Sequence, residues 1–308
     1  MRVILAGGSG LIGRELAQVL LNAGYEVIVL SRNPDSNALH SARISMVHWD
    51  GKTRDRWAEL VEGAHAVVNL AGANIAGEGF FPSRWTDERK QRIYQSRVDA
   101  GKALVSALQA ARIKPRLLVQ SSAIGYYGVQ GDVPLTESSP AGLDFMARVC
   151  VDWENSTQAA EALGIRRVII RTGVVFTAKG GALTRMLLPY RLFAGGPYGN
   201  GRQVVSWIHI ADEVNAILHL IENEEADGVY NLTAPGPVTN NELGRTLGKV
   251  MHRPHWLPIP GFAMRLLFGE VATVVLDGQK VLPERLLSSG YVFQYPHILE
   301  AFQNILAR

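Results

Sequence analysis

Three glycines near the start of the chain have the spacing of a phosphate-binding turn. Gly7, Gly10 and Gly13 stand between a short apolar run, Val3–Ala6, and a stretch that predicts an amphipathic helix over residues 14–23. Glycines permit a tight turn and a close backbone approach to a ligand, and the following helix N-terminus offers free N–H groups and partial positive charge. The alternative is a glycine-rich turn without a ligand, but the place between strand and helix favours a nucleotide site. The residues expected to hold a pyrophosphate are Gly7, Ser9, Gly10, Leu11, Ile12 and Gly13.

The second apolar run ends in residues suited to one particular dinucleotide. Glu26–Leu30 is followed by Ser31 and Arg32. Proteins selective for NAD usually carry an acidic residue near this point, which binds the ribose 2′-hydroxyl. A hydroxyl and a guanidinium suit a 2′-phosphate instead, so the sequence favours NADP(H), with a solvated arginine as the alternative. Asp50, just before Gly51, can accept a hydrogen bond from an adenine amino group or simply form a turn.

The elements that must position these residues alternate between strand and helix. Long helical stretches are expected at about residues 86–111 and 143–163. Such alternation predicts a doubly wound parallel sheet with helices on both faces, the Rossmann class of α/β fold. The apolar runs that predict its buried strands are Val3–Ala6, Glu26–Leu30, Ile44–Val47, Ala66–Leu70, Leu117–Gln120 and Arg167–Ile170.

The second half of the chain follows a looser pattern. Val204–Ile210 and Gly228–Leu232 predict further strands around a helix from Asp212 to Glu222, and the region from Val238 onward is helical with many prolines. Without a linker between the halves, we expect a smaller, mostly helical substrate-binding domain interleaved with the first domain. The predicted division gives residues 1–172 and 204–235 to the cofactor domain, and 173–203 and 236–308 to the substrate domain.

Composition narrows the class of protein. The chain has 308 residues, of which 47% are hydrophobic and 19% charged, and its net charge is +3. Lys and Arg are scattered, which argues against nucleic acid as a partner. The single cysteine, Cys150, excludes an internal disulfide, and no apolar run is long enough to span a bilayer. We expect a cytoplasmic monomer or homodimer that acts on a small molecule and does not bind membranes.

Several further motifs resemble those of extended short-chain dehydrogenases/reductases. Asn69–Gly72 resembles the N-x-A-G motif of that group, and Ser121–Gly128 its fifth-strand serine motif. More narrowly, the chain is similar to the atypical "epimerase family" subgroup, which is nucleoside-diphosphate-sugar epimerase-like and has its own C-terminal domain. The stretches behind this likeness are Arg84–Thr86, Ser96–Arg97, Arg171–Val175, Gly195–Gln203 and Leu276–Pro283.

The resemblance implies NADP(H) binding and a set of further cofactor contacts. Leu70 and Ala71 are expected to line the adenosine side, and Val174 to approach the nicotinamide. The implied set is completed by Gly72, Arg97 and Ser121. No His, Cys and Asp grouping has metal-ligand spacing, so we expect no metal.

The usual catalytic pair of extended members, Tyr-x-x-x-Lys, has no counterpart here. By alignment, Met146 stands in place of the tyrosine and Cys150 in place of the lysine. Ser122 and Tyr126, at the carboxyl end of the fifth strand, are the catalytic candidates, with Tyr127 as the alternative proton donor. Arg97 or Arg148 can supply positive charge. Cys150 is a candidate nucleophile, but a lone helical cysteine is more often a small core hydrophobe.

Three other features have expected roles outside these motifs. Gly195–Gln203, which contains Arg202, can bind an anion or be a mobile connection. His209 is expected to be structural, and Asp212 to cap the following helix. The sequence thus predicts an NADP(H)-dependent oxidoreductase or epimerase-like enzyme for a small polar substrate, with a sugar nucleotide as one candidate. A catalytically silent NADP(H)-binding sensor or scaffold is the rival.

Overall fold

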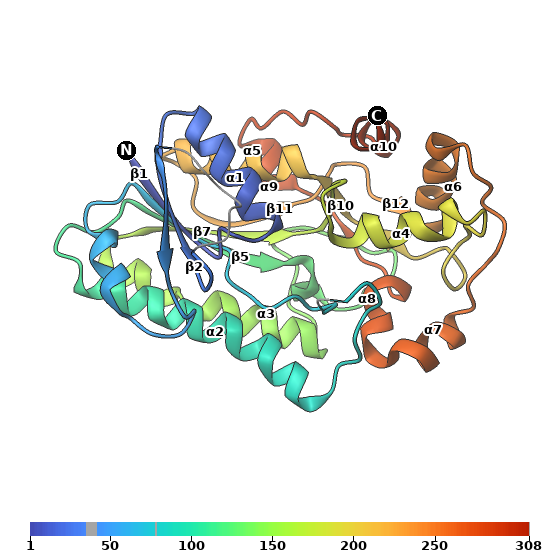
Figure 1. Cartoon of the computed structure of the whole chain (residues 1–308), viewed down its shortest axis with the longest axis horizontal. Helices are drawn as coiled ribbons and strands as arrows, with labels where there is room; N and C mark the ends of the chain where they lie inside the picture. Colours follow the sequence, from blue (N-terminus) through green and yellow to red (C-terminus); the bar gives the residue numbers. More distant parts are fainter. Residues whose placement is uncertain (35–41, 78, 308) are drawn as a thin grey trace.

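The computed structural model describes residues 1–34, 42–77 and 79–307, and its centre is a seven-stranded sheet (Figure 1). Every pair of neighbouring strands is parallel, in the order β11-β7-β5-β4-β1-β2-β3. The predicted Rossmann class is therefore confirmed. Because the order reverses between β1 and β4, a crevice forms beyond their carboxyl ends, where ligands of such sheets bind. The strands are β1 (Arg2–Ala6), β2 (Glu26–Ser31), β3 (Ile44–His48), β4 (Ala66–Asn69), β5 (Leu117–Ala123), β7 (Arg166–Thr172) and β11 (Gly228–Leu232).

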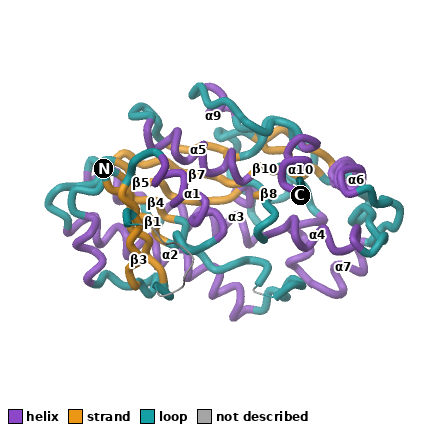
Figure 2. Tube along the Cα trace, turned by 45° about the horizontal axis from the view of Figure 1, so that its top comes forward, coloured by secondary structure: helices purple, strands orange, loops and turns teal. Residues whose placement is uncertain are grey.

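Helices cover both faces of the sheet, as Figures 1 and 2 show. On one face α1 (Leu11–Asn22) and α5 (Ile210–Glu222) pack on Val3, Val27 and their neighbours in one apolar cluster. On the other face α2 (Asp87–Ala110) packs on Ile4 and Val67 in a second cluster. The inner strands are largely buried, which explains their continuous apolar runs. The prediction that Ile44–Val47 is buried is wrong, because β3 is an edge strand and none of its residues is buried. The second face also carries α3 (Phe145–Asn155) and the 3-10 turns η1 (Arg56–Val61) and η3 (Gln158–Leu163).

A smaller, mostly helical unit lies beyond the carboxyl ends of β7 and β11, at the right of Figure 1. It has its own apolar cluster, with Phe176, Trp207 and Phe302 at its centre. Three pairs of short strands link the segments that join this unit to the sheet domain: β10 with β8, β12 with β9, and β13 with β6. The helices of this unit are α4 (Gly181–Arg191), α6 (Asn240–Met251), α7 (Gly261–Phe268), α8 (Thr273–Leu276) and α10 (Ile298–Leu306), whereas α9 (Glu284–Ser288) packs on β11 and places Leu286 in the core of the sheet domain. The short strands and turns are η2 (Ile124–Tyr127), β6 (Pro134–Leu135), β8 (Val174–Phe176), β9 (Val204–Val205), β10 (Trp207–His209), β12 (Val238–Thr239), η4 (Gly269–Ala272) and β13 (Lys280–Val281).

Two predicted elements are divided in the structure. The helix expected over residues 143–163 ends at Asn155, where Ser156 turns its hydroxyl back to the Trp153 carbonyl (2.6 Å), and η3 follows. The strand expected over 204–210 is split at Ser206, whose hydroxyl donates to the Gln279 carbonyl and accepts from the Val281 amide, both at 2.8 Å. These local side-chain bonds compete with continued helix or ladder pairing.

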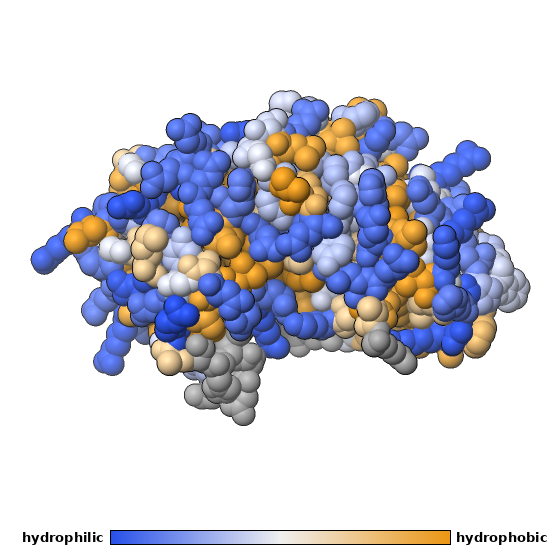
Figure 3. Space-filling view, turned by 90° about the horizontal axis from the view of Figure 1, so that it is seen from above, coloured by the Kyte–Doolittle hydropathy of each residue, from blue (hydrophilic) through white to orange (hydrophobic). Residues whose placement is uncertain are grey.

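Exposed apolar side chains are unevenly distributed over the surface. The face seen in Figure 3 is mostly hydrophilic, with hydrophobic atoms in strips between the polar side chains. Along α7, by contrast, Phe262, Leu266 and Leu267 are more than half exposed. This helix therefore lies against the molecule without being buried in it. In the described ranges, no helix combines the length and the apolar character needed to cross a bilayer.

Candidate functional site

The glycine turn between β1 and α1 is shaped by close backbone contacts. Gly7 has φ +77°, and a Cβ there would lie 2.9 Å from the backbone of Ala71; one on Gly13 would lie 2.5 Å from Gly8. Gly10 is the N-cap of α1 and provides no side-chain cap. The first described helical bond runs from the Arg14 amide to the Gly10 carbonyl (3.0 Å), so the N–H groups of the first turn remain available to an anion.

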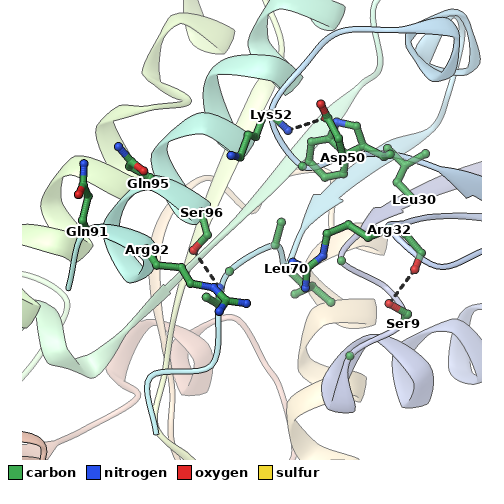
Figure 4. Close-up of a pocket in the computed structure, with 18 of the residues that line it drawn as sticks. Ser9, Leu30, Arg32, Asp50, Lys52, Leu70, Gln91, Arg92, Gln95 and Ser96 are labelled. Carbon is green, nitrogen blue, oxygen red and sulfur yellow. Dashed lines mark hydrogen bonds between the residues drawn. The ribbon is translucent and has the colours of Figure 1, made fainter. Parts of the chain in front are cut away.

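A cavity of ≈ 520 Å³ opens in front of this turn, beyond the carboxyl ends of β1, β2 and β4 (Figure 4). Its walls bring together eight of the predicted cofactor residues: Gly7, Ser9, Gly10, Ser31, Arg32, Leu70, Ala71 and Gly72. The other predicted contacts, Leu11, Ile12, Gly13, Arg97, Ser121 and Val174, are not among its lining residues. Leu11 and Ile12 lie in the first turn of α1 beside the cavity, and Gly13 is buried under it.

The end of β2 presents one anchored polar side chain and one exposed cation. The Ser31 hydroxyl donates to the Ser9 hydroxyl (3.1 Å) and accepts from the Asn33 amide (3.2 Å). Arg32 is exposed and extends into the cavity, as Figure 4 shows, without a hydrogen bond or ion pair to the described part of the chain. A charged side chain held in a cavity without a protein counter-ion is typical of an anion-binding site.

Asp50, on the opposite wall of the cavity, stabilises the turn formed by the residues that follow it. Burial on its own raises the pKa of this carboxyl, but hydrogen bonds from the Thr53 and Lys52 amides and the Thr53 hydroxyl outweigh that effect and lower it. Both carboxylate oxygens are used, at 2.8 Å each. The turn interpretation of Asp50 is therefore confirmed, although the residue also lines the cavity.

One wall of the cavity comes from α2 and was not predicted from the sequence. The residues share one helix face: Glu88, Gln91, Arg92, Gln95 and Ser96. Their spacing of three and four was visible in the sequence but indicates only a polar face. Ser96 joins this face to the end of β4, because its hydroxyl accepts from the Ala73 amide (2.9 Å) and donates to the Ile93 carbonyl (3.1 Å). Other lining residues not identified are Leu30, Trp49, Lys52 and Ala73.

The carboxyl end of β5 carries a buried polar network. The Ser122 hydroxyl donates to Glu154 Oε1 (2.6 Å), and Arg171 makes a two-pronged ion pair with the same carboxylate, at 2.9 Å on each oxygen. Arg171 Nη1 also donates to the Tyr127 hydroxyl (3.1 Å), which donates in turn to Asn231 Oδ1 (2.7 Å). Burial lowers the pKa of Arg171, but its bonds to Glu154 outweigh this and raise it above the usual value. Tyr127 is therefore a structural member of this network, and burial raises the pKa of its hydroxyl.

Tyr126 differs from its neighbour. Its ring lies on the Arg171 guanidinium, with 3.3 Å from Cζ to the ring centroid, and its hydroxyl makes no hydrogen bond within the described residues. The adjacent helix α3 presents Met146 and Cys150 to the same turn: a Cβ on Gly125 would lie 3.4 Å from Met146 Cβ and 3.7 Å from Cys150 Sγ. Burial raises the pKa of Cys150 to about 11, so this thiol stays protonated near neutral pH and is a poor nucleophile.

The remaining candidates lie outside the cavity. Val174 is half-buried in β8, and Arg148 and Arg202 are exposed. His209 is the N-cap of α5, with Nδ1 accepting from the Ala211 amide (3.0 Å). The prediction that Asp212 caps this helix is wrong, because β10 ends at His209 and the helix begins earlier. Asp212 instead accepts from the Gln294 and Tyr295 amides and the Tyr291 hydroxyl, at 2.7 to 3.0 Å.

Within residues 1–34, 42–77 and 79–307, no group of three or more His, Cys, Asp or Glu side chains is arranged to hold an ion.

The chain is similar in sequence and structure to several known proteins. "Epimerase family protein YfhF" of Bacillus subtilis is 37% identical over 100% of this chain and 98% of its own length. The chloroplastic SDR39U1 homolog of Arabidopsis thaliana is 39% identical, over 99% of this chain and 87% of that protein. A crystal structure of human epimerase family protein SDR39U1 (isoform 2) with NADPH has a TM-score of 0.89 and 33% identity, covering 100% of this chain and 99% of that one.

Two family models match separate parts of the chain. Residues 259–305 match a domain of unknown function, DUF1731. Residues 3–233 match the model of the NAD dependent epimerase/dehydratase family. The expected family likeness is thereby confirmed, and the chain belongs to the NAD dependent epimerase/dehydratase family, with an extended short-chain dehydrogenase/reductase-like fold and a DUF1731 C-terminal domain.

Proposed function

We propose that this protein binds NADP(H) and acts as an oxidoreductase or epimerase-like enzyme on a small polar substrate, with a sugar nucleotide as one candidate. The observation that carries the cofactor proposal is Arg32, which extends into the cavity beside Ser31 without a counter-ion among the described residues. A guanidinium and a hydroxyl together suit the 2′-phosphate that distinguishes NADP from NAD. The human relative bound to NADPH supports the same choice.

In this proposal the cavity holds the adenosine side of the dinucleotide, and the nicotinamide extends beyond it toward β5 and β8. The uncapped first turn of α1, with Leu11, Ile12 and Gly13, would bind the pyrophosphate, and Leu70 and Ala71 would line the adenosine. Ser121 and Val174 would lie at the nicotinamide end, beyond β5 and β7. When bound, the cofactor supplies or accepts a hydride there. The smaller unit, with Gly195–Gln203, would hold the substrate over this end.

Tyr126 is the proposed proton donor. It follows the carboxyl end of β5, its hydroxyl is not engaged by the described chain, and its ring is held against the Arg171 guanidinium, so the hydroxyl is positioned and available to a substrate. Ser122 donates its proton to Glu154, so it can polarise a substrate oxygen only by giving up that bond. It therefore serves chiefly to hold the Glu154–Arg171 pair beneath Tyr126.

A catalytically silent cofactor-binding sensor remains the second candidate. The observation in its favour is that the two positions of the usual Tyr-x-x-x-Lys pair hold side chains that cannot do the same chemistry. Met146 does not titrate, and Cys150 is a protonated, buried thiol. Neither can take over the proton transfer.

Cofactor choice can be tested by thermal unfolding with NADPH or NADH at equal concentrations. A ligand that binds only the folded protein raises stability with the logarithm of its saturation, so we expect the larger shift with NADPH. Arg32→Asp should remove the difference, whereas Arg54→Asp, an exposed arginine outside the cavity, should keep it. Equal stabilisation of the unaltered protein by the two nucleotides contradicts the assignment.

Turnover separates the enzyme from the sensor. The purified protein would be given NADPH with a panel of carbonyl compounds and nucleotide sugars, and cofactor oxidation and sugar products would be followed. We expect turnover that falls at least tenfold in Tyr126→Phe with cofactor affinity unchanged. Tight NADPH binding without turnover on any member of the panel favours the sensor.

A further inference from the structure

Arg97 places a cation directly behind the cavity wall. The residue comes from α2, and its guanidinium Cζ lies 4.9 Å from the centroid of the Trp153 ring. On the other side a Cβ on Gly72 would lie only 3.1 Å from that same carbon. Gly72 and Ala73 line the cavity, so one layer of backbone separates the charge from the space in front.

Among the described residues, the guanidinium has hydrogen-bond partners but no counter-ion. Nη1 donates to the carbonyls of Ala73 (3.1 Å) and Ile93 (2.9 Å), and no carboxylate within the described chain pairs with it. Burial lowers the pKa of Arg97 to about 10, and burial also raises that of the neighbouring Cys150 to about 11. Near neutral pH the arginine is therefore charged and the thiol is not.

Arg97 differs from Arg171 in how its charge is compensated. Arg171 is buried and paired with both oxygens of Glu154. Arg97 is only half-buried, and its charge has no carboxylate partner among the described residues. Its field therefore acts on a charged ligand bound in front of Gly72 and Ala73.

We propose that Arg97 is a positioning residue whose fixed charge makes the site prefer the reduced over the oxidised form of its nicotinamide cofactor. This inference rests on the proposed NADP(H) function. The oxidised ring carries one positive charge more than the reduced ring. Cys150, an electrostatic neighbour of Arg97, lies at the turn after β5, where the nicotinamide end is proposed. The guanidinium and the oxidised ring, both positive, repel each other, while the phosphates of either form are attracted.

The test is the ratio of dissociation constants for NADP⁺ and NADPH, measured by calorimetry. We expect a ratio of at least about tenfold in the unaltered protein, or ~1.4 kcal/mol. In Arg97→Met both affinities should fall and the ratio should drop about tenfold, whereas Arg97→Lys should keep it. A purely structural role would weaken both forms equally. Lys102→Met removes an exposed charge from the same helix and should leave the ratio unchanged.

Two results overturn the inference, and they are distinguishable. A ratio near one in the unaltered protein, or an unchanged ratio in Arg97→Met, excludes the electrostatic role while leaving cofactor binding intact. The first of these measurements needs no variant, so misfolding of Arg97→Met would not hide the answer. If the unaltered protein binds neither form, the proposed function fails and this inference fails with it.

Discussion

At the scale of single residues, the polar groups under the sheet edge differ in how they are satisfied. Glu154 accepts from Ser122 and twice from Arg171, so both of its oxygens are used in the interior. Glu213, at the start of α5, accepts only from the Thr172 hydroxyl (2.8 Å), and its Oε2 has no partner among the described residues. Removing one carboxyl should therefore affect stability differently from removing the other.

Glu154→Gln should destabilise the protein by about 3 kcal/mol. Breaking a buried ion pair by removing one partner leaves the other charge uncompensated, which typically costs 3–5 kcal/mol, and the amide retains part of the hydrogen bonding. Urea unfolding measures this difference. The matched control is Glu161→Gln, which removes the half-exposed partner of Arg167 and should change stability by roughly 0.5 kcal/mol or less. Equal effects of the two substitutions would show that the buried pair contributes no more than the surface pair.

Glu213 should make stability fall as pH rises. Burial raises the pKa of this carboxyl from 4.5 to about 8, so the folded protein keeps a proton that the unfolded chain releases. Between these values the folded state binds more protons, and the free energy of unfolding decreases with increasing pH. Between pH 5 and 8, the free energy of unfolding of the unaltered protein should fall by roughly 3 kcal/mol more than that of Glu213→Gln, as measured by urea unfolding. Glu222→Gln, an exposed change on the same helix, should follow the unaltered curve, and parallel curves for Glu213→Gln would refute the assignment.

At the scale of elements, the turn between β1 and α1 depends on how closely two backbones approach. Gly13→Ala should raise helix propensity by about 1 kcal/mol, yet a Cβ there would lie 2.5 Å from Gly8. Because the neighbouring atoms belong to the backbone and cannot easily move, we expect the clash to outweigh the gain in helix propensity. The free energy of unfolding, measured with denaturant, should fall by about 1–3 kcal/mol. In the control Gly261→Ala, the nearest atom to a Cβ is 3.6 Å away, so that change should be neutral or stabilising. A stabilising effect of Gly13→Ala would mean that α1 can shift away from the turn.

The sequence predicted those parts of the site whose signal is local. The glycine turn, the strands and the place of Ser31 and Arg32 follow from a few consecutive residues, and the structure has the seven strands of the central sheet where they were predicted. The α2 wall was not predicted, because the spacing of Gln91 and Gln95 defines a polar face but not what lies opposite it. The partner of Ser122 is separated from it by 32 residues, so that contact depends on how α3 packs.

At the scale of the whole molecule, the C-terminal segment is tied into the sheet domain by polar bonds. The side-chain amide of Asn231, in β11, donates to the Leu282 carbonyl (3.0 Å), and the backbone amide of Asn231 donates to Glu137 Oε1 (3.0 Å). Glu137 also accepts from the Arg285 amide (3.2 Å). Through the Tyr127 hydroxyl, the same Asn231 joins the Arg171–Glu154 pair. The segment that matches DUF1731 is therefore connected to the polar network beneath the candidate site.

This connection predicts that the two units unfold together. Phe302 of α10 is fully buried and its ring lies 5.4 Å from that of Phe176, so Phe302→Ala should cost about 3–5 kcal/mol. If the network couples the units, calorimetry should give a single transition that moves to lower temperature as a whole, although Phe302 is remote from the sheet. The exposed Leu287→Ala should leave the transition in place. Two separate transitions, with only one displaced by Phe302→Ala, would mean that the C-terminal unit melts independently. The bonds from Asn231 and Glu137 would then join the surfaces without transmitting stability between them.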